Sequence, residues 1–223
     1  MIRMNGLIRL AFAVSLLSAF SAPAFAFQLA SRSAEEWIKT LESPQRIQSQ
    51  KVDDVISRLN LKPGQVIADI GAGSGVFSRP LAKAVAPTGK VYAVDIEKGL
   101  LDFINQTAKQ QNLANIQTVL GEFNDPKIPE RDVDVAFIND VLHHIENRAA
   151  YIKALGTYVK PGGKVALIEM NKDDPNTTHK GQPELLVSRE EIDQWMSAAG
   201  FKLVQEYPDL FPGAKWFLIY GKK

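Results

Sequence analysis

Residues 66–77 read VIADIGAGSGVF, an apolar run that ends in an acid and three alternating glycines. The apolar run is typical of a buried strand, and the glycines predict a sharp turn into a helix. Gly71, Gly73 and Gly75 let the backbone adopt positive φ angles and let a ligand lie against the main chain, where a Cβ would collide. The N–H groups at the start of the following helix then favour an anion.

The spacing of the glycines restricts the kind of ligand. A dinucleotide-binding turn has the pattern G-x-G-x-x-G, whereas here the third glycine falls one residue early and Val76 follows it. A nicotinamide cofactor is therefore disfavoured. Asp69 lies two residues before the first glycine, where an acid holds an ammonium group or orders water around one. This pattern suits a nucleoside that carries an amino acid; the alternative is a tight connector with Asp69 as a turn acid.

Three further motifs follow the glycine turn, each after an expected strand. Asp95 ends the second strand, Gly121-Glu122 follows the third, and residues 139–144, NDVLHH, follow the fourth. Together with the glycine turn they resemble the class I S-adenosylmethionine-dependent methyltransferases, and are most similar to the small-molecule enzymes of ubiquinone and menaquinone biosynthesis. The resemblance covers about residue 52 to the C-terminus.

The alternation of strand and helix patterns predicts an α/β sandwich with a mostly parallel sheet. The resemblance implies a Rossmann-like sheet of seven strands with helices on both faces, in which the last hairpin inserts one antiparallel strand. The expected strands are residues 66–70, 90–95, 116–120, 133–138, 164–170, 201–207 and 215–221.

The cofactor implied by the resemblance is S-adenosyl-L-methionine. Asp95 lies at a strand end 20 residues past Gly75, where a carboxylate accepts hydrogen bonds from ribose hydroxyls; the alternative is a helix cap. By the resemblance Glu122 contacts the adenine amino group; the alternative is a solvated loop acid. The full set of expected cofactor-binding residues is Asp69, Gly71, Ala72, Gly73, Gly75, Asp95, Ile96, Glu122 and Asn139.

All three histidines of the chain, His143, His144 and His179, are candidates for activating a methyl acceptor, because imidazole is a tunable general base. The alternative is that they are packed, hydrogen-bonded motif residues. Adjacent histidines on a helix point about 100° apart, so His143 and His144 are expected to differ in role. We predict no metal site, because the histidine pair has no acids on its own face.

The N-terminal 26 residues differ from the rest of the chain. A basic start, an uncharged apolar segment and the sequence PAFA at 23–26 predict a secretory signal peptide cleaved after Ala26; a permanent anchor is the alternative. The domain is then expected in the periplasm or secreted, with no stable membrane span after cleavage. This expectation conflicts with a cofactor that is made in the cytoplasm.

The remainder divides into a helical lid at 27–62 and a Rossmann-like methyltransferase domain at 63–223. Helical spacing predicts two helices between residues 31 and 59, with a break at Ser43-Pro44. The polar segment 171–187 is long for a connection inside a compact domain, which is typical of a functional lid. In the resembled fold the substrate wall is built here.

Composition restricts the function further. The 223 residues carry a net charge of +1, which gives no indication of a nucleic-acid partner, and the absence of cysteine excludes disulfides, thiolate metal sites and a cysteine nucleophile. We therefore expect methyl transfer to a small-molecule or lipid-like acceptor. The alternatives are a non-catalytic extracytoplasmic binder of S-adenosylmethionine or S-adenosylhomocysteine, and a nicotinamide-dependent oxidoreductase. The sequence leaves the acceptor and the oligomeric state open.

Overall fold

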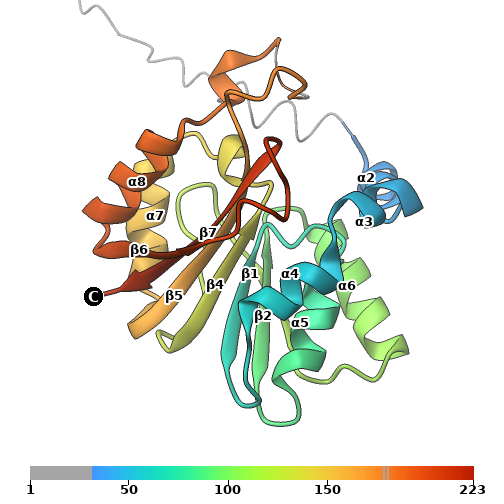
Figure 1. The fold of residues 1–223 in the computed structure, drawn as a ribbon. Coiled ribbons are helices and arrows are strands. Elements are labelled where there is room, and N and C mark those ends of the chain that lie inside the picture. Colours follow the sequence, from blue (N-terminus) through green and yellow to red (C-terminus); the bar gives the residue numbers. More distant parts are fainter. Residues whose placement is uncertain (1–31, 178, 180) are drawn as a thin grey trace, which may run out of the picture. The chain divides into compact units, whose positions relative to one another are not determined.

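The fold is built on a seven-stranded sheet with the strand order β3-β2-β1-β4-β5-β7-β6, shown in Figure 1. The computed structural model describes residues 32–177, 179 and 181–223, so the expected signal peptide at 1–26 lies outside the described residues. The strands are β1 (Val66–Ile70), β2 (Lys90–Asp95), β3 (Ile116–Leu120), β4 (Val133–Asn139), β5 (Val159–Met170), β6 (Phe201–Glu206) and β7 (Lys215–Lys222).

Only β7 runs antiparallel to its neighbours, because it pairs antiparallel with both β5 and β6 while the other pairs are parallel. The expected insertion of one antiparallel strand by the last hairpin is confirmed, as is the α/β fold class. β5 begins five residues earlier than predicted, at Val159, because Val133 of β4 pairs with it there and the register then shifts.

The helices cover both faces of the sheet. They are α2 (Ala34–Leu41), α3 (Pro44–Ser49), α4 (Val52–Leu59), α5 (Ser78–Val85), α6 (Lys98–Gln110), α7 (Arg148–Gly156) and α8 (Arg189–Ala198), with the 3-10 turns η1 (Leu142–His144) and η2 (Pro183–Leu185). Ser188 and Glu191 form a capping box at the start of α8.

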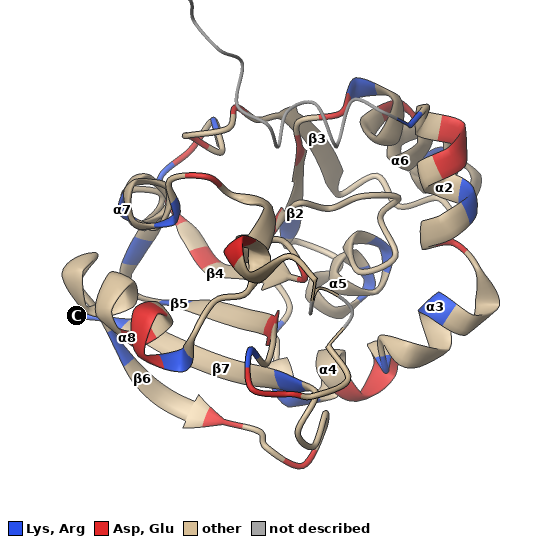
Figure 2. Ribbon diagram, turned by 90° about the horizontal axis from the view of Figure 1, so that it is seen from above, with Lys and Arg blue, Asp and Glu red and all other residues tan. Residues whose placement is uncertain are grey.

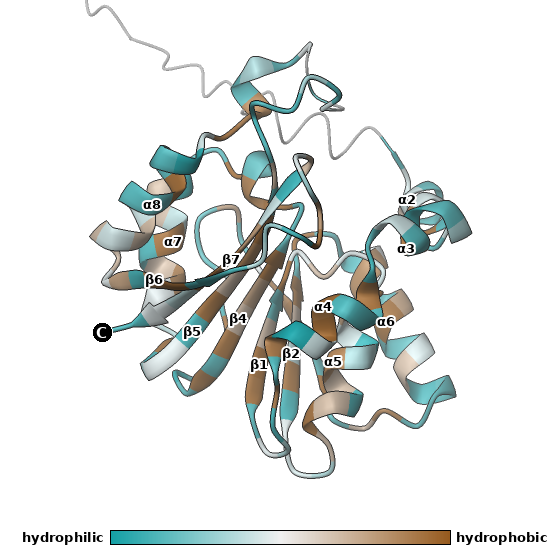
Figure 3. Ribbon diagram, in the orientation of Figure 1, coloured by the Kyte–Doolittle hydropathy of each residue, from teal (hydrophilic) through white to brown (hydrophobic). Residues whose placement is uncertain are grey.

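Alternate residues of each strand enter two different cores, as the two-residue period of a strand requires. In β1, Ile67 packs with α4 and α5, whereas Ala68 and Ile70 face the core formed with α7 and α8. Burial on both faces explains why the central strands are rich in apolar residues, which are brown in Figure 3. The apolar side chains of α6 pack on β2 and β3, beside α5.

The prediction of two N-terminal helices is wrong, because the structure has three. The break at Ser43-Pro44 is present, with Pro44 in the first turn of α3. A second break at Lys51, whose φ is 48°, separates α3 from α4. Long-range contacts account for this second break, since Lys51 donates to the Leu210 carbonyl at 2.6 Å while Gln50 is buried against the turn after β4.

Charged residues of both signs are interspersed along the ribbon in Figure 2, and neither sign is confined to one element. Arg32–Lys223 form one compact unit. None of the helices in the described part of the chain has the length and apolar character that a membrane crossing requires.

Candidate cofactor and acceptor site

A small cavity of about 90 Å³ lies at the carboxyl ends of β1 and β4. The strand order reverses between these two strands, and open α/β sheets bind their ligands at such a point. Three parts of the chain line the cavity: the β1–α5 turn (Asp69, Gly71, Ala72, Gly73, Ser74, Val76, Phe77), the turn after β4 (Asn139, Asp140, Val141) and the N-terminal helices (Leu41, Arg46, Gln50).

The glycine turn packs directly on the turn after β4. Gly71 has a φ of 65°, and a Cβ placed on it would lie 2.3 Å from Cγ2 of Val141. Because atoms cannot approach that closely, only glycine fits this position without a backbone shift. Gly75 also has a positive φ, but it faces Ile104 of α6 and does not line the cavity.

Asp95 holds the glycine turn from the neighbouring strand. Its Oδ2 accepts the Gly73 N–H at 2.8 Å and its Oδ1 accepts the Glu97 N–H at 3.0 Å. Burial raises the pKa of this carboxyl above its usual value. The helix-cap alternative for Asp95 is wrong, because Glu97 is the N-cap of α6 and accepts the Gly99 N–H with its own side chain.

Asp69 lies at the end of β1 with only 3% of its surface exposed. Its Oδ2 accepts a hydrogen bond of 2.6 Å from the Ser78 hydroxyl. Burial raises the pKa of Asp69 to about 7, and the nearby Asp95 adds to this shift although the Ser78 bond opposes it. The charge of Asp69 therefore responds to any cation that enters the cavity.

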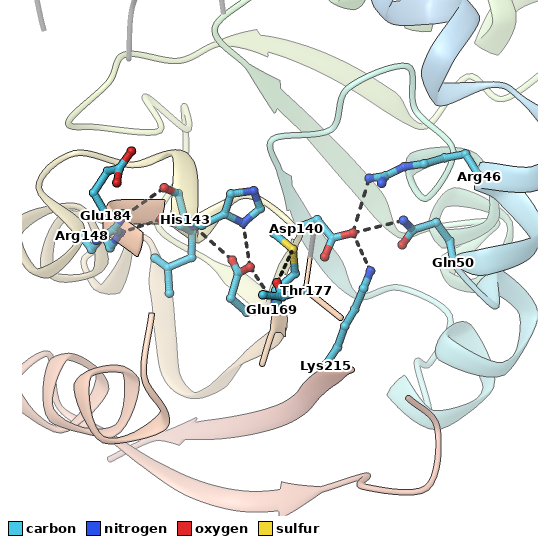
Figure 4. A network of polar contacts seen from close by, with 11 residues as sticks. Arg46, Gln50, Asp140, His143, Arg148, Glu169, Thr177, Glu184 and Lys215 are labelled. Carbon is cyan, nitrogen blue, oxygen red and sulfur yellow. Dashed lines mark hydrogen bonds and ion pairs between the residues drawn. The ribbon is translucent and has the colours of Figure 1, made fainter. Parts of the chain in front are cut away.

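Asp140 joins the turn after β4 to two distant elements, as Figure 4 shows. Its Oδ2 accepts from Lys215 Nζ of β7 at 2.6 Å, from Gln50 Nε2 at 3.1 Å and from Arg46 of α3 at 3.4 Å. Burial alone would raise the pKa of Asp140, but Lys215 and Arg46 hold it below its usual value. Gln50 also accepts from Asn139 Nδ2 at 3.1 Å. We call these five residues the Asp140 cluster.

Three buried side-chain oxygens have no hydrogen-bond partner among the described residues: Ser74 Oγ, Asn139 Oδ1 and Asp140 Oδ1. All three belong to residues that line the cavity. A buried acceptor without a donor is unfavourable, by about 1–3 kcal/mol in typical cases. Three such oxygens around one cavity indicate that a ligand with hydrogen-bond donors belongs there.

The three histidines lie together at η1. The ring centroid of His143 is 4.0 Å from that of His144 and 5.2 Å from that of His179. His143 and His144 lie in a three-residue 3-10 turn, and their rings pack together. Burial, together with the neighbouring His143 and His179, lowers the pKa of His144 to about 3.

His143 is buried against Glu169 of β5. Its Nδ1 lies 2.7 Å from Glu169 Oε1, and its backbone N–H donates to Glu169 Oε2 at 3.2 Å. Arg148 of α7 donates to the carbonyls of His143 and Glu184, each at 2.9 Å, and so ties the 171–187 segment to η1. Within the described residues, no group of three histidines or acids has the arrangement of a metal site.

Five of the expected cofactor residues therefore line the cavity, namely Asp69, Gly71, Ala72, Gly73 and Asn139. Asp95 does not line the cavity but accepts the N–H of Gly73, which does. Ile96 is half-buried and does not line the cavity. Glu122 is exposed, lies outside the cavity-lining set and pairs with Lys127 at 3.4 Å. None of the three histidines lines this cavity.

Residues 61–207 match the family described as "Methyltransferase domain". The chain belongs to this methyltransferase family. The match includes the whole of the site except for the N-terminal helices and Lys215.

Relatives of the chain include the demethylmenaquinone methyltransferase of Geobacillus sp. (strain WCH70), which is 30% identical over 120 residues, 54% of this chain and 51% of the relative. The ubiquinone/menaquinone biosynthesis C-methyltransferase of Burkholderia cenocepacia (strain HI2424) is 27% identical over 117 residues, 52% of this chain and 48% of the relative. This methyltransferase-family chain thus spans about half the length of the curated relatives it matches.

Solved structures share the fold of this methyltransferase-family chain. A methyltransferase from Aquifex aeolicus, described as SAM-dependent, superposes with a TM-score of 0.74 at 23% identity, over 86% of this chain and all of that one. The magnesium protoporphyrin IX methyltransferase from Synechocystis PCC 6803, solved with bound SAM, has a TM-score of 0.61 at 20% identity, covering 90% of both chains. At these identities the likeness concerns the fold.

The residues of this methyltransferase site fit S-adenosylmethionine, the cofactor that the sequence resemblance implies. The ligand carries an ammonium group on its methionine half and hydroxyls on its ribose, which are the donors that the unpaired oxygens at Ser74, Asn139 and Asp140 lack. Buried Asp69 and half-buried Asp95 add two carboxyl groups that suit a cationic, hydroxyl-bearing ligand.

Sequence reasoning missed Gln50, Arg46, Lys215 and Glu169. For Glu169 a signal was available, because it is the one charged residue among the last five of an otherwise apolar strand pattern, ALIEM, and buried acids need a partner. Gln50, Arg46 and Lys215 lie 75 to 94 residues from Asp140 in the chain, and no local pattern marks them.

Proposed function

We propose that this chain transfers a methyl group from S-adenosylmethionine to a small, quinone-like or lipid-like aromatic acceptor. The proposal is supported by the cavity between the carboxyl ends of β1 and β4, where three buried oxygens lack the hydrogen-bond donors that such a cofactor carries. It is also supported by relatives named for demethylmenaquinone and for ubiquinone/menaquinone biosynthesis.

When bound, the cofactor supplies an electrophilic methyl group on a sulfonium whose leaving group is neutral. The chain's own residues therefore have to bind, align and exclude water, since alignment and exclusion of water supply most of the acceleration in such a transfer. Gly71 and Gly73 let the ligand approach the main chain, and Asp95 fixes that backbone. Gln50 and Arg46 place α3 at the mouth of the cavity.

The wall for the acceptor is proposed to be η1 and the 171–187 segment. Two contacts hold this segment. Thr177 Oγ1 lies 3.9 Å from Sδ of Met170 in β5, and the ring of His179 packs on His143 in η1. An apolar acceptor suits this mixture of thioether and imidazole surfaces.

We further propose that the domain acts outside the cytoplasm, on the basis of the signal-peptide pattern at residues 1–26. Fractionation of cells that express the full chain tests this location, because it measures how much of the protein lies outside the cytoplasm. Mass spectrometry of the purified product would show Phe27 as the new N-terminus if the signal is cleaved after Ala26.

The experiment for the proposed activity is calorimetric titration of the full chain with S-adenosylmethionine, S-adenosylhomocysteine and NAD, followed by a methyl-transfer assay. The assay probe is 1,4-dihydroxynaphthalene with a short prenyl chain, kept reduced. Binding of the two sulfur ligands with transfer to the probe is the expected result. Binding without turnover would favour the non-catalytic binder, and NAD binding would contradict the cofactor assignment.

A further inference from the structure

The pair formed by His143 and Glu169 is the most buried acid–base pair in the part of the chain that the structure describes. His143 is 3% exposed and Glu169 is 1% exposed. Their side chains meet at 2.7 Å, at the carboxyl ends of the adjacent strands β4 and β5. Nothing in the cofactor cavity uses this pair, so its burial requires another explanation.

The hydrogen bonds around Glu169 determine the tautomer of His143. Glu169 Oε2 accepts the His143 backbone N–H, and Oε1 accepts the Met170 N–H at 2.8 Å as well as the contact from Nδ1. A carboxylate with two backbone donors acts as an acceptor toward the ring as well, so Nδ1 carries the proton. The lone pair of the neutral ring then lies on Nε2.

Within the described residues the hydrogen bond of the His143 ring is made by Nδ1, and none is made by Nε2. His143 lies three residues after Asp140, which lines the cofactor cavity, and Figure 4 draws both residues. The other titratable or charged groups around the ring are His144 of η1, His179 of the 171–187 segment and Arg148 of α7.

The other two histidines have different surroundings. No carboxylate among the described residues is hydrogen-bonded to His144, and its lowered pKa keeps it uncharged. His179 has Gln182 as its ring partner at 3.2 Å, and an amide does not stabilise an imidazolium as a carboxylate does. Only His143 has the carboxylate that both orients a base and stabilises its protonated form.

We propose that His143, positioned by Glu169, is the general base that activates the acceptor, and that the acceptor carries an ionisable aromatic hydroxyl such as that of a hydroquinone. This proposal rests on the proposed function. Nε2 of His143 takes the proton of the acceptor's hydroxyl, while the carbon of the acceptor's aromatic ring next to the hydroxyl-bearing carbon forms the bond to the methyl group. The S–CH₃ bond breaks with its electron pair remaining on sulfur, the ring carbon then loses its own proton and the hydroxyl is restored. The net products are methylated acceptor, S-adenosylhomocysteine and one proton.

The test uses the full-chain variants Glu169→Gln and His143→Asn with the prenylated dihydroxynaphthalene probe. The asparagine amide still donates to Glu169, so the buried acid keeps a partner. Both variants should bind S-adenosylmethionine as the wild type does and lower kcat by about 100-fold or more at pH 7, since general bases contribute about 10²–10⁴-fold. Glu146→Gln is the matched control, because Glu146 is exposed two residues from His144; its kcat should stay at the wild-type value.

The pH profile separates a base from a structural role. A phenolic hydroxyl ionises by itself near pH 10, so kcat of both variants should approach that of the wild type there. A deficit that stays constant with pH would overturn the proposal. Nitrogen-15 NMR of the imidazole rings gives a readout without turnover: the wild type should show His143 protonated on Nδ1, and Nε2 protonation would overturn it.

The outcomes distinguish this inference from the function on which it rests. If the wild type methylates the probe and the variants are unimpaired, the role of the His143–Glu169 pair is refuted while the proposed activity remains. If the wild type binds S-adenosylmethionine but does not methylate the probe, the hydroquinone acceptor is refuted together with this base.

Discussion

The β1–α5 turn and the turn after β4 occupy equivalent places, each at the carboxyl end of a central parallel strand, yet they are built differently. The first depends on the backbone conformation of neighbouring residues, with Gly71 and Gly73 at positive φ, and Asp95 of the next strand holds this backbone in place. The second is held by side chains from distant parts of the chain: Lys215 on Asp140 and Glu169 on His143.

This difference explains which parts of the site can be deduced from a sequence. A glycine turn depends on backbone conformation, so its spacing shows in a short segment. A turn held by side-chain contacts depends on which residues meet after folding, and their separation in the chain is arbitrary. The two turns also touch, since Val141 of the second occupies the space where a Cβ of Gly71 would lie.

The largest effect is expected at the second turn, from Asp140→Ala. It leaves Lys215, whose side chain is 16% exposed, without its carboxylate. Removing one partner of a buried ion pair typically destabilises a protein by about 3–5 kcal/mol. Urea unfolding should show this loss. In the control Asp102→Ala, the ion pair with Lys98 is exposed on α6 and the unfolding midpoint should not move measurably. An equal loss of unfolding free energy in the two variants would mean that the ion pair at Asp140 stabilises the second turn no more than an exposed pair stabilises a helix.

At the first turn, Gly71→Ala tests whether contact with Val141 or backbone conformation alone requires glycine. We expect a loss of about 3 kcal/mol, combining the left-handed backbone penalty with overpacking. Gly162→Ala is the matched control: its φ is 74° but no atom lies within 4 Å of the added Cβ, so about 1 kcal/mol is expected. Urea unfolding of both measures the difference, and identical losses would mean that the two turns do not depend on each other.

Asp95→Ala tests the link between the first turn and its ligand. This substitution removes the carboxylate that accepts the Gly73 and Glu97 N–H groups, a half-buried group beside the cavity. We expect S-adenosylmethionine to bind at least about 100-fold more weakly, which corresponds to about 2.7 kcal/mol. Calorimetry measures this, with exposed Asp132→Ala as the control. Wild-type affinity in the Asp95 variant would refute the assignment of the cofactor to this turn.

The smallest effect is expected from pH acting on Asp69, whose pKa is raised to about 7 by burial. A cationic ligand beside this carboxyl lowers its pKa, so binding releases a proton wherever Asp69 is protonated in the free protein. Affinity for S-adenosylmethionine should therefore rise as pH increases toward 7 and level off above it, by about tenfold per pH unit at most. Calorimetry between pH 5.5 and 8 measures this slope, which Asp69→Asn should abolish. An affinity of the wild type that does not change with pH would contradict the proposed effect of Asp69.

The fold could be predicted largely from the sequence. β2 and β3 match their predicted bounds, and the glycine turn, the Asp95 strand end and the capping box at Ser188 all follow from short segments. The errors fall where distant residues intervene. The sequence does not show the break at Lys51, whose side chain reaches Leu210, or the bonds by which Glu169 and Arg148 hold the backbone of η1.

The sequence by itself determined the parallel α/β architecture and the cofactor half of the site, because strand periodicity and glycine spacing are local properties of the chain. Tertiary structure alone decided that Asp140 is held by Lys215 and α3, and that His143, rather than the neighbouring His144, pairs with Glu169. Two adjacent histidines are equivalent in a sequence. They become different only when one of them is buried against a carboxylate 26 residues away.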